Sequence, residues 1–279
     1  MKTISKKDFA LVFFGLTFLL TWACWITAAM MPPDQYATLI TVLHYAGGIM
    51  PTVTALIFLY LFSDEQVRRD YWRRLTDLKR ISRGWYAVIL LTVPVLTLAG
   101  VLIDRLMGGT GADAGAAAEI FRSPLTLIPF AIFIFLFGPL PQEMAWRGLA
   151  LDGLQRVRNA FSASVLLGTF WTLWQLPLFF IEGTYQFGLG VGTTGFWLYM
   201  LDKVPVSIVM TWIFNNNRRS TAAAVLLHFM ISFVGELFDL SLQAEKITVA
   251  GWWMLAVLIV LIWKPHRFVR PVVNPDSGE

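Results

Sequence analysis

Charge and cysteine are both scarce in this sequence. Only 14% of its 279 residues are charged, 57% are hydrophobic, and the mean hydropathy is +0.63. This composition lies outside the range of soluble globular domains. The single cysteine, Cys24, excludes an intramolecular disulfide and gives no sign of an oxidising compartment. The net charge of +4 comes without a basic cluster of the kind that binds nucleic acid.

The hydrophobic residues are collected in long runs along the chain. A helix needs about 20 apolar residues to cross roughly 30 Å of hydrocarbon, and the runs predict about eight transmembrane helices in one all-α bundle. We predict a single polytopic membrane domain over residues 1–279, with a motif-bearing core at residues 125–240. The predicted spans are residues 9–31, 37–62, 86–103, 125–140, 161–181, 196–214, 221–240 and 247–263.

Lysine and arginine are unevenly divided between alternate loops. Eighteen lie in the termini and the loops on the same side, three (Arg105, Arg122 and Lys246) lie on the other side, and Lys203 falls inside the sixth run. Positively charged loops stay on the cytoplasmic side of a membrane. We therefore expect both termini to be cytoplasmic.

Polar side chains at membrane depth are costly, so each is a candidate functional residue. After the fourth run, a Pro-rich turn leads into Gln142, Glu143 and Arg147. Glu143 and Arg147 are four residues apart, on one face of a helix, where they can form an ion pair. Taken alone, this spacing is only a common device for stabilising helices.

Two later runs also carry isolated polar residues. Gln175 is the one strongly polar side chain in an aromatic run and precedes Pro177. A single hydrogen bond between helices would explain it equally well. His228 and Ser232 are four residues apart in the seventh run and share a face, which Glu236 extends by another turn.

Together the three segments resemble the CAAX prenyl protease and bacteriocin-processing (CPBP) family of intramembrane proteases. That family carries Glu-Glu-x-x-x-Arg, then Phe-x-x-x-His before Leu-Pro, then His with Asn four residues later after an Asn- and Arg-rich turn. The counterparts here, in the same order, are Gln142-Glu143 with Arg147-Gly148, then Gln175-Leu176-Pro177, then His228 after Asn215-Asn216-Asn217-Arg218. The stretch Gly47-Gly48-Ile49-Met50-Pro51 also resembles the family.

Three positions depart from the family pattern. Gln142 stands where the resemblance implies a glutamate that activates the attacking water, and Gln175 where it implies a histidine. Ser232 stands where the resemblance implies an asparagine that, with the histidine, stabilises the developing oxyanion. An amide takes no proton at neutral pH. Loss of a general base costs roughly 10²- to 10⁴-fold in rate, and loss of an oxyanion donor roughly 10²- to 10³-fold.

Glu143, Arg147 and His228 keep the family pattern. Glu143 can replace the missing base only in an altered arrangement, because adjacent side chains on a helix, such as those at positions 142 and 143, point about 100° apart. A metal site needs several suitable ligands, and His228 and Glu143 alone are available near the motif positions. We therefore expect no metal and no other cofactor.

We predict a CPBP-like protein whose peptidase activity is reduced or lost, with a cavity for a hydrophobic peptide or a lipidated tail. One alternative is an active intramembrane endopeptidase that uses Glu143 and His228. The other is a membrane transporter or lipid-handling protein with Asp202, Lys203 and Glu236 as its polar pathway. The expected partners are the lipid bilayer and such a peptide, with no nucleic acid, and the expected location is a bacterial plasma membrane. The sequence does not predict an oligomeric state.

Overall fold

The computed structural model describes residues 8–263, 266 and 268, except for the side chain of residue 121. The long helices are α1 (Asp8–Ala29), α2 (Pro33–Phe62), α4 (Arg83–Leu106), α6 (Pro124–Phe137), α9 (Ala160–Trp174), α11 (Thr194–Asn216), α12 (Thr221–Leu237) and α13 (Leu242–Trp263). The shorter elements are α3 (Glu65–Thr76), η1 (Leu78–Arg80), β1 (Ala112–Asp113), α5 (Gly115–Arg122), α7 (Pro139–Ala145), η2 (Trp146–Ala150), α8 (Leu151–Gln155), η3 (Leu176–Phe180), α10 (Tyr185–Leu189) and β2 (Asp239–Leu240).

The prediction of an all-α bundle with about eight spans is confirmed. In the described part of the chain, seven helical segments are long and apolar enough to cross a membrane. α12, with 17 residues, is a shorter apolar helix beside them. The observed bounds differ from the predicted ones by a few residues at most ends, as expected when hydropathy alone defines them.

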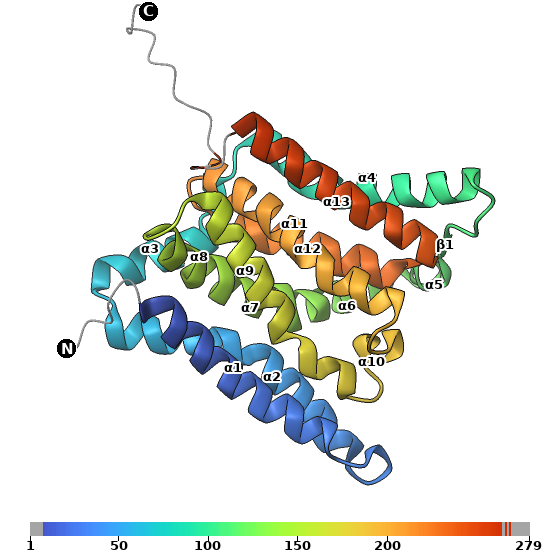
Figure 1. The fold of residues 1–279 in the computed structure, drawn as a ribbon, viewed down its shortest axis with the longest axis horizontal. Coiled ribbons are helices and arrows are strands. Elements are labelled where there is room, and N and C mark those ends of the chain that lie inside the picture. The colour runs from blue at the N-terminus through green and yellow to red at the C-terminus, as the bar shows by residue number, and fades with distance from the viewer. Residues whose placement is uncertain (1–7, 264–265, 267, 269–279) are drawn as a thin grey trace, which may run out of the picture.

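The bundle has a buried centre and an apolar exterior. α9 and α11 pack on each other and are the most enclosed helices. In the spans that contain them, 61% of the most apolar stretch is buried, against 17% in α4 and α13. Figure 1 shows α1 and α2 along one side, α4 and α13 along the opposite side, and α7, α9, α11 and α12 between them. Lipid is therefore the natural solvent for the outer helices.

Two predicted spans are wrong in detail. The fourth, residues 125–140, ends as a regular helix at Phe137, and the chain bends at Gly138 before continuing to Gln155. The seventh, residues 221–240, ends at Leu237, because Asp239 and Leu240 pair with Asp113 and Ala112 in a two-residue antiparallel ladder. Hydropathy responds to neither a backbone bend nor a strand pairing, so it merged these segments.

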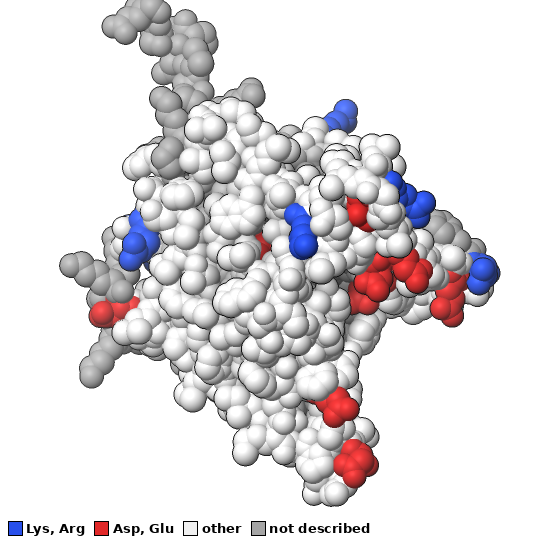
Figure 2. All heavy atoms as spheres, turned by 45° about the vertical axis from the view of Figure 1, so that its right-hand side comes forward, with Lys and Arg blue, Asp and Glu red and all other residues white. Residues whose placement is uncertain are grey.

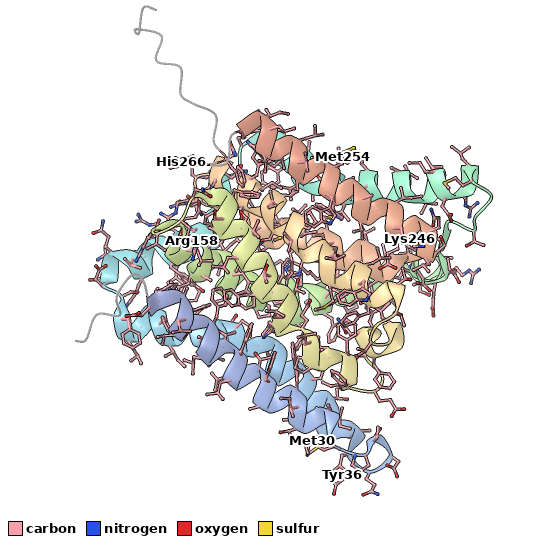
Figure 3. All side chains as sticks on the ribbon, viewed as in Figure 1. Met30, Tyr36, Arg158, Lys246, Met254 and His266 are labelled. Carbon is pink, nitrogen blue, oxygen red and sulfur yellow. The ribbon has the colours of Figure 1, made fainter. Side chains whose placement is uncertain are left out.

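Charged residues gather toward the ends of the helices. Most of the described Lys and Arg lie at the end of the bundle near α3, where they flank the ends of α1, α2, α4, α9, α11, α12 and α13. Figure 3 labels Arg158 at this end and Lys246 at the other, and Figure 2 shows a face that is mostly uncharged between its margins. Six of the 18 basic residues assigned to this side, Lys2, Lys6, Lys7, Lys264, Arg267 and Arg270, lie outside the described residues.

A tight turn joins α11 to α12. Arg218 and Arg219 have φ of 53° and 56°, a left-handed conformation that non-glycine residues rarely adopt. Buried Asn217 donates from Nδ2 to the Ile213 carbonyl (2.8 Å), and Ser220 Oγ caps α12 by accepting from the Ala223 amide (3.2 Å). The turn folds α12 back along α11, which brings His228 into the bundle.

α1 and α2 approach closely at a glycine. Trp25 is buried, and its indole N–H donates to the His44 carbonyl (2.8 Å), while Thr21 Oγ1 donates to the Gly47 carbonyl (3.1 Å). A Cβ at Gly47 would lie 2.3 Å from Trp25 Nε1, whereas a Cβ at Gly48 would meet nothing within 4 Å. Only the first glycine is therefore required by packing.

Replacing Gly47 with alanine should destabilise the bundle by about 1–3 kcal/mol, because the rigid, hydrogen-bonded Trp25 ring has to shift. The neighbouring change Gly48→Ala is the matched control. It should be neutral or stabilise α2 by up to about 1 kcal/mol, since alanine favours a helix over glycine. Thermal unfolding of the purified variants in detergent measures both, and equal melting temperatures for the two variants would contradict the packing argument.

Candidate functional site

The candidate site begins where the fourth span breaks. Gly138 has φ −120° and ψ −90°, which ends α6, and Pro139 and Pro141 open α7 in positions where a helix needs no amide donor. Thr52 of α2 donates its hydroxyl hydrogen to the Pro141 carbonyl, which ties the break to a neighbouring helix. The bend redirects the chain so that Gln142 and Glu143 face the inside of the bundle.

The next turn is a π-helix. Over η2 the Leu151 amide bonds to the Trp146 carbonyl, five residues back, so the usual four-residue ladder is interrupted. The carbonyls of Met144 and Gly148 accept hydrogen bonds from Tyr71 Oη (3.0 Å) and Arg74 Nη2 (2.8 Å), both on α3. Such wide turns occur most often at functional sites.

Burial raises the pKa of the Tyr71 hydroxyl, which keeps it protonated as a donor to the Met144 carbonyl. A Cβ at Gly148 would lie 2.8 Å from the Tyr71 ring. α3 therefore fits against the π-turn closely enough that this position requires glycine. α3 and η1 lie between the second and third predicted spans, and the contacts of α3 support the site.

Glu143, Arg147 and His228 meet in the centre of the bundle. Arg147 Nη1 donates to both carboxylate oxygens of Glu143 (3.0 and 3.1 Å), and both side chains are completely buried. His228 Nδ1 lies 2.9 Å from Glu143 Oε1, and Arg147 Nη2 donates to Ser207 Oγ (3.2 Å). The predicted ion pair is thus present, and it connects α7 and η2 to α11 and α12.

Gln142 lies beside this network through an indole ring. Trp171 Nε1 donates to Gln142 Oε1 (2.9 Å), and its ring meets the His228 ring edge to face with centroids 5.0 Å apart. The Arg147 guanidinium carbon lies 5.4 Å from the centroid of the same indole. Trp171 therefore contacts three of the six predicted residues.

Gln175 and Ser232 complete the predicted set less tightly. Gln175 closes α9, is buried, and its side-chain oxygen has no hydrogen-bond partner among the residues that the structure describes. Ser232 lies one turn beyond His228 and is half-buried. The structure records no direct bond from either to Gln142, Glu143 or His228 within its described part, so these two positions stay predictions.

Sequence reasoning missed Trp171 and Ser207. Trp171 precedes Gln175 by four residues, so its position on the same helical face was a usable signal. Ser207 carries no motif, and only the packing of α11 against η2 reveals its bond to Arg147. Glu236, which was expected to extend the face of His228, is exposed instead.

Comparison with known proteins shows which proteins this chain is similar to. The family model for the type II CAAX prenyl endopeptidase Rce1-like proteins matches residues 124–234, a segment that contains all six predicted site residues. A "CAAX prenyl protease 2" of Methanococcus maripaludis is 27% identical over 261 residues, which cover 93% of this chain and 96% of that protein. Both comparisons support the resemblance of this chain to the CPBP family. Together with the apolar helices, this resemblance indicates an integral membrane protein.

No cluster of three His, Cys, Asp or Glu side chains that could share a metal ion occurs among residues 8–263, 266 and 268. At the centre of the bundle, Glu143 and His228 are the described side chains of a ligating type, and they are bonded to each other. Glu143 is also held through both oxygens by Arg147. The site therefore offers a buried carboxylate, an imidazole and an amide.

Replacing Glu143 with leucine should destabilise the protein by about 3–5 kcal/mol, because it leaves the Arg147 charge buried without a counter-ion. The double change Glu143→Leu with Arg147→Met should cost less than either single change, since it removes both charges together. Unfolding temperatures in detergent measure the cycle, with the exposed-residue change Arg158→Gln as a control. Additive effects of the two single changes would show that the pair is not coupled.

Proposed function

We propose that this CPBP-like protein has reduced or no peptidase activity and binds, rather than cleaves, a hydrophobic peptide or a lipidated tail. The observation that carries the proposal is the side chain at position 142. Its amide oxygen accepts the Trp171 indole hydrogen bond, and an amide has no site that takes a proton at neutral pH. The position that the family resemblance assigns to the general base is therefore occupied by a group that positions its neighbours.

The adjacent carboxylate does not readily replace the base. Glu143 is fully buried, both its oxygens accept from Arg147, and one of them also meets His228. A general base needs hydrogen-bond reach to the proton that it removes. Using Glu143 in this way would require breaking its ion pair with Arg147 and its contact with His228 of α12.

Restoring the family residues tests the proposal. The triple change Gln142→Glu, Gln175→His and Ser232→Asn should raise cleavage of a farnesylated CAAX-type peptide in nanodiscs by at least about 10²-fold, because it returns a base and an oxyanion donor. A carboxylate at position 142 still accepts the Trp171 hydrogen bond, so the fold should survive. Cleavage by the unchanged protein at the rate of the triple variant would overturn the proposal.

An active endopeptidase is the second candidate, and one contact favours it. His228 Nδ1 faces the Glu143 carboxylate at 2.9 Å, an arrangement in which a carboxylate orients an imidazole as a base. In that mechanism the other ring nitrogen, Nε2, takes the proton from the attacking water. Glu143 is then a positioning residue.

This second candidate predicts that the unchanged protein cleaves the peptide and that His228→Ala lowers the rate by roughly 10²- to 10⁴-fold. Arg158→Gln, a change at an exposed residue, should leave the rate unchanged. Absence of cleavage by the folded, unchanged protein removes this candidate while leaving the binding proposal intact.

The transporter alternative has less support. Lys203 Nζ pairs with Asp202 Oδ1 (2.7 Å) and lies 3.9 Å from the centroid of the Tyr199 ring. Glu236 is exposed and has no recorded bond to either residue within the described part of the chain. The three residues therefore do not form a continuous polar pathway, and substrate-dependent flux into vesicles is the observation that would revive this alternative.

The proposed orientation places the α3 end of the bundle in the cytoplasm, together with both termini. The described basic residues support it, because those near α3 far outnumber Arg105, Arg122 and Lys246 at the opposite end. The predicted bacterial plasma membrane belongs to this proposal as well.

A further inference from the structure

A cavity lies away from the candidate site, at the end of the bundle that carries α3. It has a volume of about 1220 Å³ and lies between α3, α8, the start of α1 and the end of α2. We call it the α3 pocket. Its lining residues are Phe9, Phe58, Phe62, Ser63, Asp64, Glu65, Gln66, Val67, Arg69, Asp70, Arg73, Arg74, Arg80, Leu149, Asp152, Gly153, Arg156 and Arg219.

One wall of the α3 pocket is apolar. Phe9 and Phe58 meet edge to face with centroids 5.7 Å apart, Phe58 also contacts Phe62, and Leu149 lies beside them. These residues belong to the ends of membrane-spanning helices or follow them directly. An apolar surface at that depth is suited to the upper part of an acyl chain.

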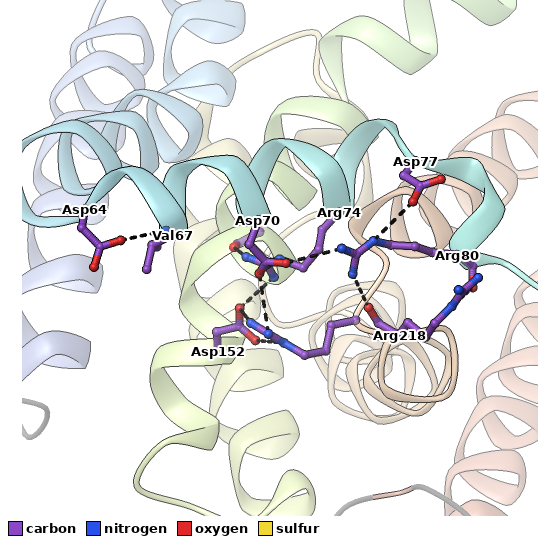
Figure 4. Close-up of polar contacts among 10 residues, drawn as sticks. Asp64, Val67, Asp70, Arg74, Asp77, Arg80, Asp152 and Arg218 are labelled. Carbon is purple, nitrogen blue, oxygen red and sulfur yellow. Dashed lines mark hydrogen bonds and ion pairs between the residues drawn. The ribbon is translucent and has the colours of Figure 1, made fainter.

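The other wall is charged, and its acidic residues already have partners. Asp70 and Asp152 pair with Arg74, Arg80 and Arg219, which join α3 to α8 and to the α11–α12 turn (Figure 4). Glu65 pairs with Arg69 (2.6 Å), and Asp64 accepts from the Val67 amide (2.9 Å) as the cap of α3.

Two cations remain on this wall. Arg73 and Arg156 line the pocket and are exposed, and their guanidinium groups have no ion pair or hydrogen bond to any residue that the structure describes. Guanidinium groups bind phosphate through paired, charge-assisted hydrogen bonds. The pocket therefore offers unused positive charge beside an apolar wall, at the end of a membrane bundle.

We infer that the α3 pocket binds an anionic phospholipid, with the headgroup phosphate at Arg73 and Arg156 and the acyl chains against Phe9, Phe62 and Leu149. Basic residues at the membrane boundary attract anionic lipids. The ligand would also bridge α3 and α8, which flank the candidate site. The inference goes beyond the proposed function and does not depend on whether the site cleaves a peptide.

Lipid binding to the purified protein tests the inference. Native mass spectrometry with phosphatidylglycerol and phosphatidylcholine should show preferential binding of phosphatidylglycerol. The double change Arg73→Gln with Arg156→Gln should weaken that binding by about tenfold or more, as expected for the loss of two charge-assisted contacts. Equal binding of the two lipids, or an unchanged affinity in the double variant, overturns the inference.

The matched control is Arg83→Gln with Arg158→Gln, which removes two exposed charges from the same end of the bundle without touching the α3 pocket. This control should change the affinity for phosphatidylglycerol by less than about threefold, whereas equal losses in the two double variants would indicate general surface attraction and overturn a specific pocket. The melting temperature of each variant confirms that it is folded.

Two further measurements separate the lipid from other sources and locate it. Glycerol phosphate, which has the headgroup chemistry without acyl chains, should compete weakly or not at all. Full competition would assign the pocket to a soluble phosphate and overturn the lipid. Hydrogen exchange in nanodiscs should show that phosphatidylglycerol protects residues 64–76 and 149–156, and protection confined to other segments would place the lipid elsewhere.

Discussion

The buried contact among Glu143, Arg147 and His228 is the interaction on which the centre of this bundle depends. Placing an ion in a low-dielectric interior costs several kcal/mol, and the cost is offset only when the partners are close and well oriented. Arg147 meets both oxygens of Glu143, His228 meets one of them, and Ser207 Oγ accepts from Arg147 Nη2. Because these residues come from α7, η2, α11 and α12, the network determines how four elements fit together.

The broken fourth span follows from the same constraint. A straight helix through residues 124–155 would have neither the bend at Gly138 nor the wide turn at η2, which together place Glu143 and Arg147 in this contact. At the wide turn α3 supplies hydrogen-bond donors, from Tyr71 and Arg74, to the backbone carbonyls of Met144 and Gly148. An amphipathic segment outside the apolar core thus completes the hydrogen bonding of the site, and its charged face also lines the α3 pocket.

The retained and substituted family positions differ in what they do within the fold. Glu143, Arg147 and His228 are bonded to one another, so the ionic network survives changes elsewhere. Gln142 bonds to Trp171, and Gln175 keeps a buried oxygen without a partner in the described part of the chain. An amide at either position removes no charge from the network of Glu143, Arg147 and His228, so the scaffold keeps its buried ionic contacts.

The sequence by itself determined the membrane class, the approximate spans and the Glu143–Arg147 pair, because hydropathy and helical spacing are local properties. Only the tertiary structure decided that His228 meets Glu143 across 85 residues, that Trp171 holds Gln142, and that Glu236 faces outward. It also decided that the fourth span breaks and that α3 braces it. Contacts between distant segments depend on how helices rotate and bend against one another, and no local pattern in the chain specifies that rotation.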